Sequence, residues 1–387
     1  MRGVTHGRRS LFAFALSALI ACTGAATPTV SPTPATSTTS EAPSGPFVVE
    51  ARGPQPGDPN DLCPRKGCEF GFYSRIRIPA GWVDAIDLRP AWSVSHGEGV
   101  TVVVLDLAIA DVPDLRGKIE DRITGVGVAP TANAAASDHG TAMASIIGAS
   151  TDNGRGTAGV GWDATLVGVD MGEAYAHFET LEPEVAWDRR HLVPLFRQAA
   201  AVPGVDIISF SSIVNPSPAF EREIERIVGS GIVVVAGAGN EETPGFSEPR
   251  YPAAYDGVIG AGAVLVAADG TVGVWAGSNV GEHADVYAPA NVPSLRVEGR
   301  VDLTGGTSSA TAVTSGVIAL LLAEYPDLSP AQVEELLVSS ARPITPLIVQ
   351  LDDSGGEVVS LRPIEGDPKV RLLDAGALFE QAAALEA

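Results

Sequence analysis

Residues 305–317 read Gly305-Gly306-Thr307-Ser308-Ser309-Ala310-Thr311-Ala312-Val313-Thr314-Ser315-Gly316-Val317, and an uncharged run continues from them to Ala323. A helix that is apolar on every side belongs in a protein core. This run is too short, and too rich in Ser and Thr at its start, for a membrane span. The segment therefore predicts a buried helix that begins close to Ser308. The positive end of the helix dipole suits a nucleophile that forms an anionic intermediate. The alternative is a serine that only caps a core helix.

The whole chain has 387 residues, of which 45% are apolar and 19% are charged. It is long enough for one large domain or for two smaller domains, each with a real core. The 47 Asp and Glu residues outnumber the 25 Lys and Arg residues, and the formal net charge is −22. Such an acidic chain repels phosphate backbones, so we expect no nucleic-acid partner.

Residues 1–21 have the features of a secretory signal peptide. Three arginines precede an apolar run over residues 11–21 that is too short to cross a membrane. The run ends in Leu19-Ile20-Ala21-Cys22, which resembles the lipobox of bacterial lipoproteins, whose cysteine is lipidated and becomes the mature N-terminus. We therefore predict an exported protein that is either lipid-anchored in the cell envelope or extracellular, with membrane contact only through this anchor. The alternative is an ordinary cleavage site that leaves Cys22 unmodified.

Two further segments precede the main domain. Residues 22–47 are mostly Thr, Ser, Pro and Ala, and they predict an extended tether because they cannot bury enough apolar surface to fold. Residues 48–80 contain Cys63 and Cys68 among several Gly and Pro, and they predict a loop-rich strap on the main domain. In an exported protein a disulfide between these two cysteines is the default. A metal site is the competing interpretation, but no second Cys pair or His lies nearby in this segment.

Residues 81–387 alternate between strand and helix patterns and predict a single domain. Continuous apolar and β-branched runs predict buried parallel strands at residues 100–105, 166–169, 205–210, 232–236 and 258–264. Apolar periodicity predicts helices around residues 220–228 and 370–385, and a capping box predicts a helix that begins after Ser329. This alternation indicates an α/β fold whose mostly parallel sheet is sandwiched between helices. In such folds active groups lie just past the carboxyl ends of the strands.

Four polar residues stand at such strand ends or helix starts. Asp106 follows one predicted strand and Asn240 follows another, while His139 and Ser308 stand where helices begin. Taken alone, each has a structural explanation as a turn residue or a helix cap. Together they supply an orienting carboxylate, an oxyanion donor, a general base and a nucleophile. No Gly-x-Ser-x-Gly sequence surrounds Ser308, which argues against an α/β-hydrolase.

The chain resembles the subtilisin-like serine peptidases, or subtilases, over about residues 91–341. The resemblance rests on blocks that follow one another in the family's order: residues 102–106 with Pro113-Asp114-Leu115, His139-Gly140-Thr141, residues 153–160 with 164–169, residues 206–211, Gly239-Asn240-Glu241, Tyr251-Pro252-Ala253, residues 261–264, residues 284–289 and the serine block itself. It implies a serine endopeptidase with a subtilisin-like fold.

The resemblance also assigns roles to individual residues. It implies that Ser308 attacks the scissile carbonyl after His139 takes its proton, and that Asp106 orients the imidazole. It implies an oxyanion site formed by the amide of Asn240 and the backbone N–H of Ser308. It further implies that the substrate binds along Ser211, Ser212, Ile213, Ala238 and Gly239.

This chain departs from the family pattern at four places. Leu107-Ala108 replaces Thr-Gly after the aspartate, which drops a hydroxyl from the turn. Ala142 replaces a second histidine, and Ala312 replaces a proline in the serine block. Ser211-Ser212-Ile213 stands where Ser-Leu-Gly is common, and a branched side chain there would crowd the first specificity pocket. We therefore predict a narrowed or altered pocket and slow cleavage of general substrates.

The resemblance also sets expectations for partners and cofactors. We expect a protein or peptide substrate, a monomer, and no metal or cofactor, with calcium possible by family resemblance alone. The space between the tether and residue 81 is too small for the folded propeptide that a typical secreted subtilase carries. The alternative function is a catalytically impaired, subtilase-like protein that binds peptides without cleaving them.

Overall fold

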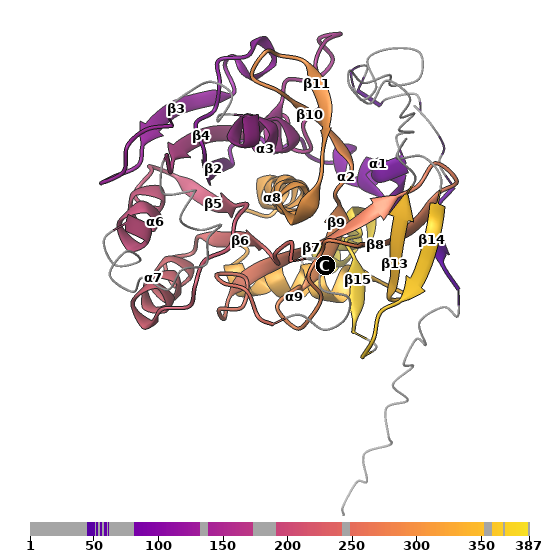
Figure 1. The fold of residues 1–387 in the computed structure, drawn as a ribbon. Coiled ribbons are helices and arrows are strands. Elements are labelled where there is room, and N and C mark those ends of the chain that lie inside the picture. Colours follow the sequence, from indigo (N-terminus) through magenta and orange to yellow (C-terminus); the bar gives the residue numbers. More distant parts are fainter. Residues whose placement is uncertain are drawn as a thin grey trace, which may run out of the picture. The chain divides into compact units, whose positions relative to one another are not determined.

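A sheet to which thirteen strands of the described residues belong forms the centre of the protein (Figure 1). The computed structural model describes residues 45–50, 52, 55, 58–59, 61, 81–131, 138–172, 191–241, 248–351, 358–366 and 368–385, all of which belong to the unit Ala42–Ala387. The predicted signal peptide, the lipidation site Cys22 and the pair Cys63 and Cys68 lie outside the described residues.

The middle of the sheet is parallel. Its strands lie in the order β9 (Val286–Pro289), β7 (Val258–Val266), β6 (Val233–Gly237), β5 (Val205–Phe210), β2 (Thr101–Asp106), β4 (Thr165–Asp170) and β3 (Ile119–Thr124). The five strands predicted from apolar runs are β2, β4, β5, β6 and β7, and each lies within two residues of its expected bounds. These strands are largely apolar because both faces of the sheet are covered.

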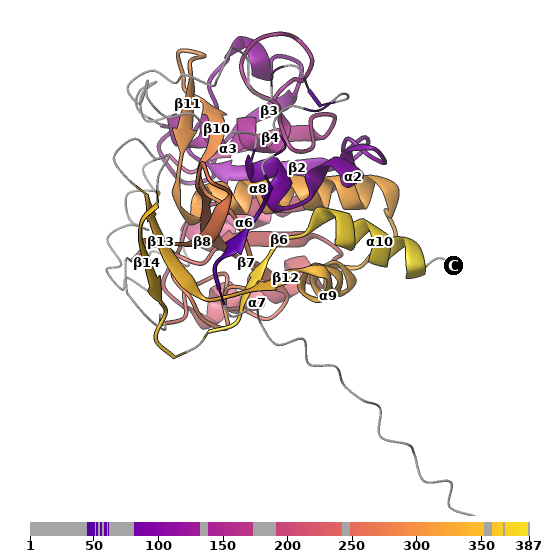
Figure 2. The same ribbon diagram turned by 90° about the vertical axis from the view of Figure 1, so that its right-hand side faces the viewer.

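Two apolar cores lie on the two faces of the sheet. Along β2 the side chains alternate, so that Val102 and Val104 join one core while Val103 and Leu105 join the other. The first core is covered by α1 (Gly81–Ala85), α2 (Leu88–Trp92), α3 (Asp138–Gly148), α8 (Gly306–Glu324), α9 (Pro330–Ser340) and α10 (Ala375–Leu385), and the second by α6 (Val193–Ala200) and α7 (Pro218–Val228) (Figures 1 and 2). The predicted α/β sandwich is confirmed.

Helix α8 is the central helix of the larger core. Every residue from Gly306 to Leu322 is buried, and the helix packs on β5, β6, β7 and β9. It is the one helix in the described residues that is long and apolar enough to cross a membrane, but 94% of its most apolar window is buried inside the protein. The prediction of a buried core helix is confirmed. The expectation that this run is too short for a membrane span is wrong, because the 19-residue helix is long enough; its burial inside the protein is the argument against a span.

Helix boundaries follow their local capping signals. Helix α7 begins after Ser217, whose Oγ accepts a hydrogen bond from the backbone N–H of Phe220 at 3.2 Å. Helix α9 begins after Ser329 with the predicted capping box, in which Ser329 and Gln332 exchange side-chain to backbone bonds. These side chains satisfy backbone groups that have no partner within the helix.

The C-terminal region differs from the prediction. The expected helix over residues 370–385 begins only at Ala375, as α10, and its first part is a short strand, β15 (Val370–Leu372). This strand pairs antiparallel with β12 (Arg342–Ile344) and parallel with β9. Three residues are too few for hydrophobic periodicity to distinguish a strand from a helix. Pairing with neighbouring strands determines the structure of this segment. The prediction also lacked β3, β9 and β12. Further strands absent from it are β8 (Thr271–Trp275), β13 (Leu347–Leu351), β14 (Val358–Pro363) and a hairpin of β10 (Val292–Leu295) with β11 (Val301–Thr304).

The described residues between 45 and 61 lie against this domain. Strand β1 (Phe47–Val48) pairs antiparallel with β8. Asp58 forms an ion pair with Arg89 of α2, with 2.6 Å between Oδ1 and Nε. Asp61 is fully buried and accepts a hydrogen bond from the backbone N–H of Asn153 at 3.2 Å. The end of the segment predicted as a tether and parts of the predicted strap therefore contact the sheet and its flanking loops.

Candidate active site

Asp106 and His139 form a hydrogen-bonded pair at the carboxyl edge of the sheet. Asp106 is the last residue of β2 and is 1% exposed, and His139 is the second residue of α3. The ring Nδ1 lies 2.7 Å from Oδ1 and 3.0 Å from Oδ2 of the carboxylate. Because an ionised carboxylate only accepts hydrogen bonds, Nδ1 carries the proton. In the neutral ring the lone pair is then on Nε2, which is the tautomer needed for a general base.

The start of α3 is fixed from two directions. Gly140 follows the histidine, and a Cβ atom at this position would lie 2.0 Å from the backbone oxygen of Leu107. Only glycine therefore lets the helix approach the turn after Asp106 this closely. From the other side, Asp138 accepts a hydrogen bond from the backbone N–H of Val297 at 2.8 Å, which joins α3 to the loop of the β10–β11 hairpin.

The turn after Asp106 lacks the family's hydroxyl but receives one from elsewhere. The backbone N–H of Ala108 donates to Thr131 Oγ1 at 3.1 Å. Thr131 in turn donates from its hydroxyl (2.5 Å) and its backbone N–H (2.9 Å) to the carboxylate of Asp170 at the end of β4. The replacement of Thr-Gly by Leu107-Ala108 is thus accommodated by a threonine 23 residues away. No local sequence pattern predicts that Thr131 is the partner of this turn.

Ser308 lies in the first turn of α8 and is 8% exposed. Its hydroxyl donates to the backbone oxygen of Ser211 at 3.2 Å, and the hydroxyl of Ser211 donates to the backbone oxygen of Ser308, also at 3.2 Å. Ser211 directly follows β5, so this exchange places Ser308 at the same carboxyl edge as Asp106. Helices α3 and α8 pack against each other. The fold thus packs the helix whose first turn carries His139 against the helix whose first turn carries Ser308.

Asn240 follows β6 and faces the first turn of α8. Its side-chain oxygen accepts two hydrogen bonds from Thr307, one from the backbone N–H and one from the hydroxyl, both at 2.9 Å. With the oxygen bound in this way, the amide nitrogen is the end of the side chain that can donate to a ligand. Sequence reasoning named Asn240 but missed Thr307, although this residue directly precedes the predicted nucleophile.

Buried polar groups hold the loop that carries Asn240 in place. Asn279 is fully buried, and its amide donates to the backbone oxygen of Ala238 at 3.0 Å, while its side-chain oxygen accepts from Glu241 N at 3.3 Å. Gly239 has φ of +104°, and a Cβ atom there would lie 2.5 Å from the Asn279 amide nitrogen. The buried asparagine and the glycine therefore fix the path of this loop.

The residues expected to bind substrate lie on the loops after β5 and β6. Ser211, Ala238 and Gly239 are buried, whereas Ser212 and Ile213 are partly exposed. Ile213 is followed by Val214, which forms an isolated antiparallel bridge with Tyr251. Both loops leave the carboxyl ends of neighbouring parallel strands, and so they flank the start of α8.

An acidic cavity of about 540 Å³ lies outside this group of residues. Its lining includes His283 and four carboxylates, those of Asp256, Glu282, Asp285 and Glu334. Burial raises the pKa of Asp285 to about 6, although the backbone N–H of Gly260 donates to it at 2.7 Å. Burial also raises the pKa of Glu334 and lowers the pKa of His283. None of the residues implied to be catalytic lines this cavity.

Comparison with known proteins gives a consistent result. The model of the Subtilase family matches residues 97–369. Subtilisin DY of Bacillus licheniformis is 32% identical over 209 residues, which cover 52% of this chain and 70% of that protein. Subtilisin NAT of Bacillus subtilis subsp. natto is 32% identical over 253 residues, and the match spans 63% of this chain and 61% of that protein. The solved structure of a protease from Pseudoalteromonas arctica PAMC 21717 is 25% identical, with a TM-score of 0.56 over 77% of this chain and 94% of that one.

Proposed function

Because this chain belongs to the subtilase family of serine-type endopeptidases, we propose that it hydrolyses peptide bonds with Ser308 as nucleophile. His139 acts as general base and Asp106 as the group that orients it. The observation that supports this proposal most strongly is the short Asp106–His139 hydrogen bond, at 2.7 Å, which orients the ring and fixes its proton on Nδ1. An intact pair of this kind argues against an impaired protein that only binds peptides.

The proposed reaction uses the groups in a fixed order. Ser308 Oγ attacks the carbonyl carbon of the peptide bond while His139 Nε2 takes its proton. The resulting imidazolium is stabilised by the buried carboxylate of Asp106 and then gives the proton to the leaving amine, which breaks the C–N bond. Water attacks the acyl-enzyme by the same route, so that the acid product and the free serine are restored.

The proposed oxyanion site has two donors. The first is the amide nitrogen of Asn240, turned outward because Thr307 binds its oxygen. The second is the backbone N–H of Ser308, which lies in the first turn of α8 and has no acceptor within the helix. Both donors are aimed before the substrate arrives, so no reorganisation is needed when the negative charge forms. Loss of an amide donor is already known to cost enzymes of this kind about 10²–10³ in kcat.

Hydrolysis of an unstructured polypeptide tests the proposal. The full mature chain should cleave it, whereas Ser308→Ala and His139→Ala should lose more than about 10³-fold in kcat. Thr314→Val is a suitable control, because Thr314 is also buried in α8 and its hydroxyl donates to the backbone oxygen of Ala310 at 2.8 Å. Cleavage that survives in Ser308→Ala at the wild-type rate would contradict the assignment.

We further propose that the protein is exported and lipid-anchored through Cys22. The arginine-led apolar run and the lipobox-like Leu19-Ile20-Ala21-Cys22 support this proposal. Radiolabelled palmitate should enter the wild-type protein in a bacterial host and should not enter Cys22→Ser. An unlabelled wild-type protein that is nevertheless released by cleavage after residue 21 would show an ordinary signal peptide instead.

Calcium is the one cofactor that the family resemblance allows, and buried carboxylates near the strap fit it. Asp61 and Asp114 are buried, burial raises the pKa of both, and Asp61 Oδ1 has no hydrogen-bond partner in the part of the chain that the structure describes. Asn153 lies between them, donating to each carboxylate. We propose that these oxygens would hold a calcium ion, a cation that prefers such ligands. By neutralising the charge of the two carboxylates, the ion would stabilise the contact between Asp61 and the domain.

A further inference from the structure

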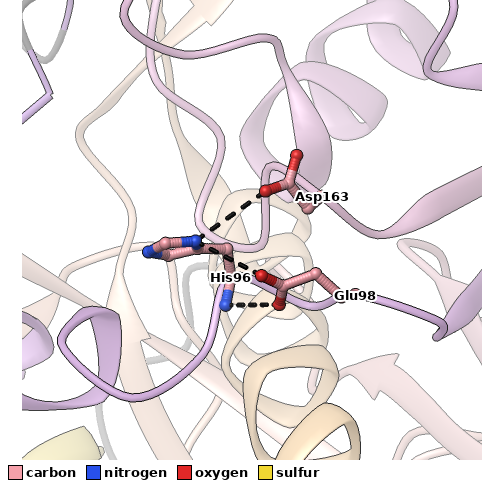
Figure 3. A group of neighbouring side chains, drawn as sticks. All are labelled: His96, Glu98 and Asp163. Atoms are coloured by element: carbon pink, nitrogen blue, oxygen red, sulfur yellow. Dashed lines mark hydrogen bonds and ion pairs between the residues drawn. The ribbon is translucent and has the colours of Figure 1, made fainter.

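A second cluster of ionisable side chains lies far from the proposed active site along the same strands. His96 and Glu98 precede β2, and Asp163 precedes β4 (Figure 3). Asp106 lies at the carboxyl end of β2, whereas these residues lie at the amino ends of β2 and β4. The three side chains converge on one point from two loops that are far apart in the sequence (Figure 3). The proposed peptidase reaction does not use them.

The ring of His96 is held in one orientation. Its Nε2 lies 3.1 Å from the backbone oxygen of Trp92, and because a carbonyl oxygen only accepts, Nε2 carries a proton. The ring also stacks on Trp162, with 4.5 Å between centroids and 26° between planes. In the neutral ring Nδ1 therefore presents an electron pair, and this atom is the one that faces the two carboxylates (Figure 3).

In each carboxylate one oxygen has a hydrogen-bond partner of its own, and the other lies nearest to Nδ1. Glu98 Oε2 accepts from the backbone N–H of His96 at 2.9 Å, and Asp163 Oδ1 accepts from Lys118 Nζ at 3.2 Å. The other oxygens, Glu98 Oε1 and Asp163 Oδ2, lie 3.4 Å and 3.8 Å from His96 Nδ1. The ring and both carboxylates are thus each held by a hydrogen bond through an atom that does not face the others. Hydrogen bonds of this kind orient metal ligands in proteins.

The spacing leaves room for a metal ion between the three side chains. A charge-assisted N–H···O bond is about 2.7–2.9 Å long, shorter than either distance. Ligand atoms about 2.1 Å from a tetrahedral zinc ion are about 3.4 Å from one another. One ligand atom from each of the three residues lies within 4.8 Å of those from the other two, and Nδ1 lies 3.4 Å and 3.8 Å from the nearer carboxylate oxygens. The shorter of the two separations from Nδ1 matches an edge of this tetrahedron and the longer exceeds it by about 0.4 Å, so the cluster can close around an ion with a small movement of Asp163.

We propose that His96, Glu98 and Asp163 bind a divalent transition-metal ion of the zinc class, with water as the fourth ligand. One imidazole nitrogen and two carboxylate oxygens are donors that zinc accepts. The ion neutralises two carboxylates that otherwise face an electron pair, and it links the loop before β2 to the loop before β4. Its place at the amino ends of these strands makes it a structural ion and not a catalytic one.

Metal titration of the mature chain tests the site directly. Ser308→Ala without a histidine tag is used, so that the protein does not digest itself and adds no foreign ligand. Zinc should bind with one-to-one stoichiometry, should change tryptophan fluorescence through Trp162, and should raise the midpoint of thermal unfolding. Cobalt(II) should give the intense visible absorption of a tetrahedral site. These effects should disappear in His96→Gln and weaken at least tenfold in affinity in Glu98→Gln and in Asp163→Asn.

Two control variants locate the ion. His139→Gln alters the proposed catalytic histidine and His283→Gln alters the acidic cavity, and both should bind zinc as tightly as the parent protein. Circular dichroism without metal checks that each variant is folded. The proposal is overturned if the folded parent shows no saturable binding. It is also overturned if binding persists in His96→Gln and is lost in either control variant, since the ion would then lie elsewhere. This test does not depend on peptidase activity.

Discussion

Replacement of Thr307 by valine isolates one hydrogen bond of the proposed oxyanion site. Valine keeps the shape of this buried side chain but removes the hydroxyl that donates to Asn240 Oδ1 at 2.9 Å. The backbone N–H of residue 307 still donates to the same oxygen at 2.9 Å, so the amide keeps one of its two anchors. One such hydrogen bond contributes about 0.5–1.5 kcal/mol. We therefore expect kcat to fall roughly 2- to 12-fold, well below the loss expected for Asn240→Ala.

Steady-state hydrolysis of a chromogenic peptide measures this effect. KM should change little, because the oxyanion forms only in the transition state. Thr314→Val, which removes a hydroxyl of the same helix without a bond to Asn240, should retain the wild-type kcat. The reasoning is refuted if Thr307→Val has wild-type kcat, or if Thr314→Val loses as much activity as Thr307→Val does.

Three further predictions concern the specificity pocket, the acidic cavity and the strap. Ile213→Gly should raise kcat/KM at least tenfold for peptides with a large residue before the cleaved bond, and it should not change kcat/KM for peptides with a small residue there. Equal changes for the two kinds of peptide would place Ile213 outside the pocket. Because the pKa of Asp285 is raised from 3.8 to about 6, the folded state keeps a proton that the unfolded state loses, so its contribution to stability falls as pH rises from about 4 to 6. In the presence of a chelator Asp285→Asn should therefore be more stable than the wild type at pH 8, by up to about 3 kcal/mol, and equal to it at pH 4; a pH-independent difference in denaturant unfolding would contradict this origin. Removal of calcium with EGTA should lower the unfolding midpoint of the wild type by several degrees and leave Asp61→Asn nearly unchanged; the same shift in both would place any calcium elsewhere.

The buried strands and the central helix could be predicted because their composition reflects burial. Strands β6 and β7 are apolar on both faces, and α8 lacks a polar face, so each of these patterns predicts a single structure. The short elements have too few residues for their composition to indicate burial or secondary structure. Strand β15 has three residues and takes its structure from β9 and β12, which lie far away in the sequence.

The same distinction holds for the proposed site. Asp106, His139, Asn240 and Ser308 were named from their places at strand ends and helix starts, and the structure shows the first pair within hydrogen-bonding distance. The residues that hold these groups were not named. Thr131 binds the turn after Asp106, and Asn279 binds the loop before Asn240, each across a long sequence separation. A single sequence records which residues can do chemistry, but it does not record which buried polar groups pair to position them.

The central claim is that His139, poised by Asp106, makes Ser308 the one activated serine of the chain. A fluorophosphonate probe followed by peptide mass spectrometry measures this most directly, because the reagent bonds to serine hydroxyls that a base has activated. We predict a single labelled site, Ser308, in the wild type, with at least a hundredfold slower labelling in His139→Ala. Unlabelled Ser308 in the folded wild type, or labelling that proceeds equally fast without His139, would contradict the account.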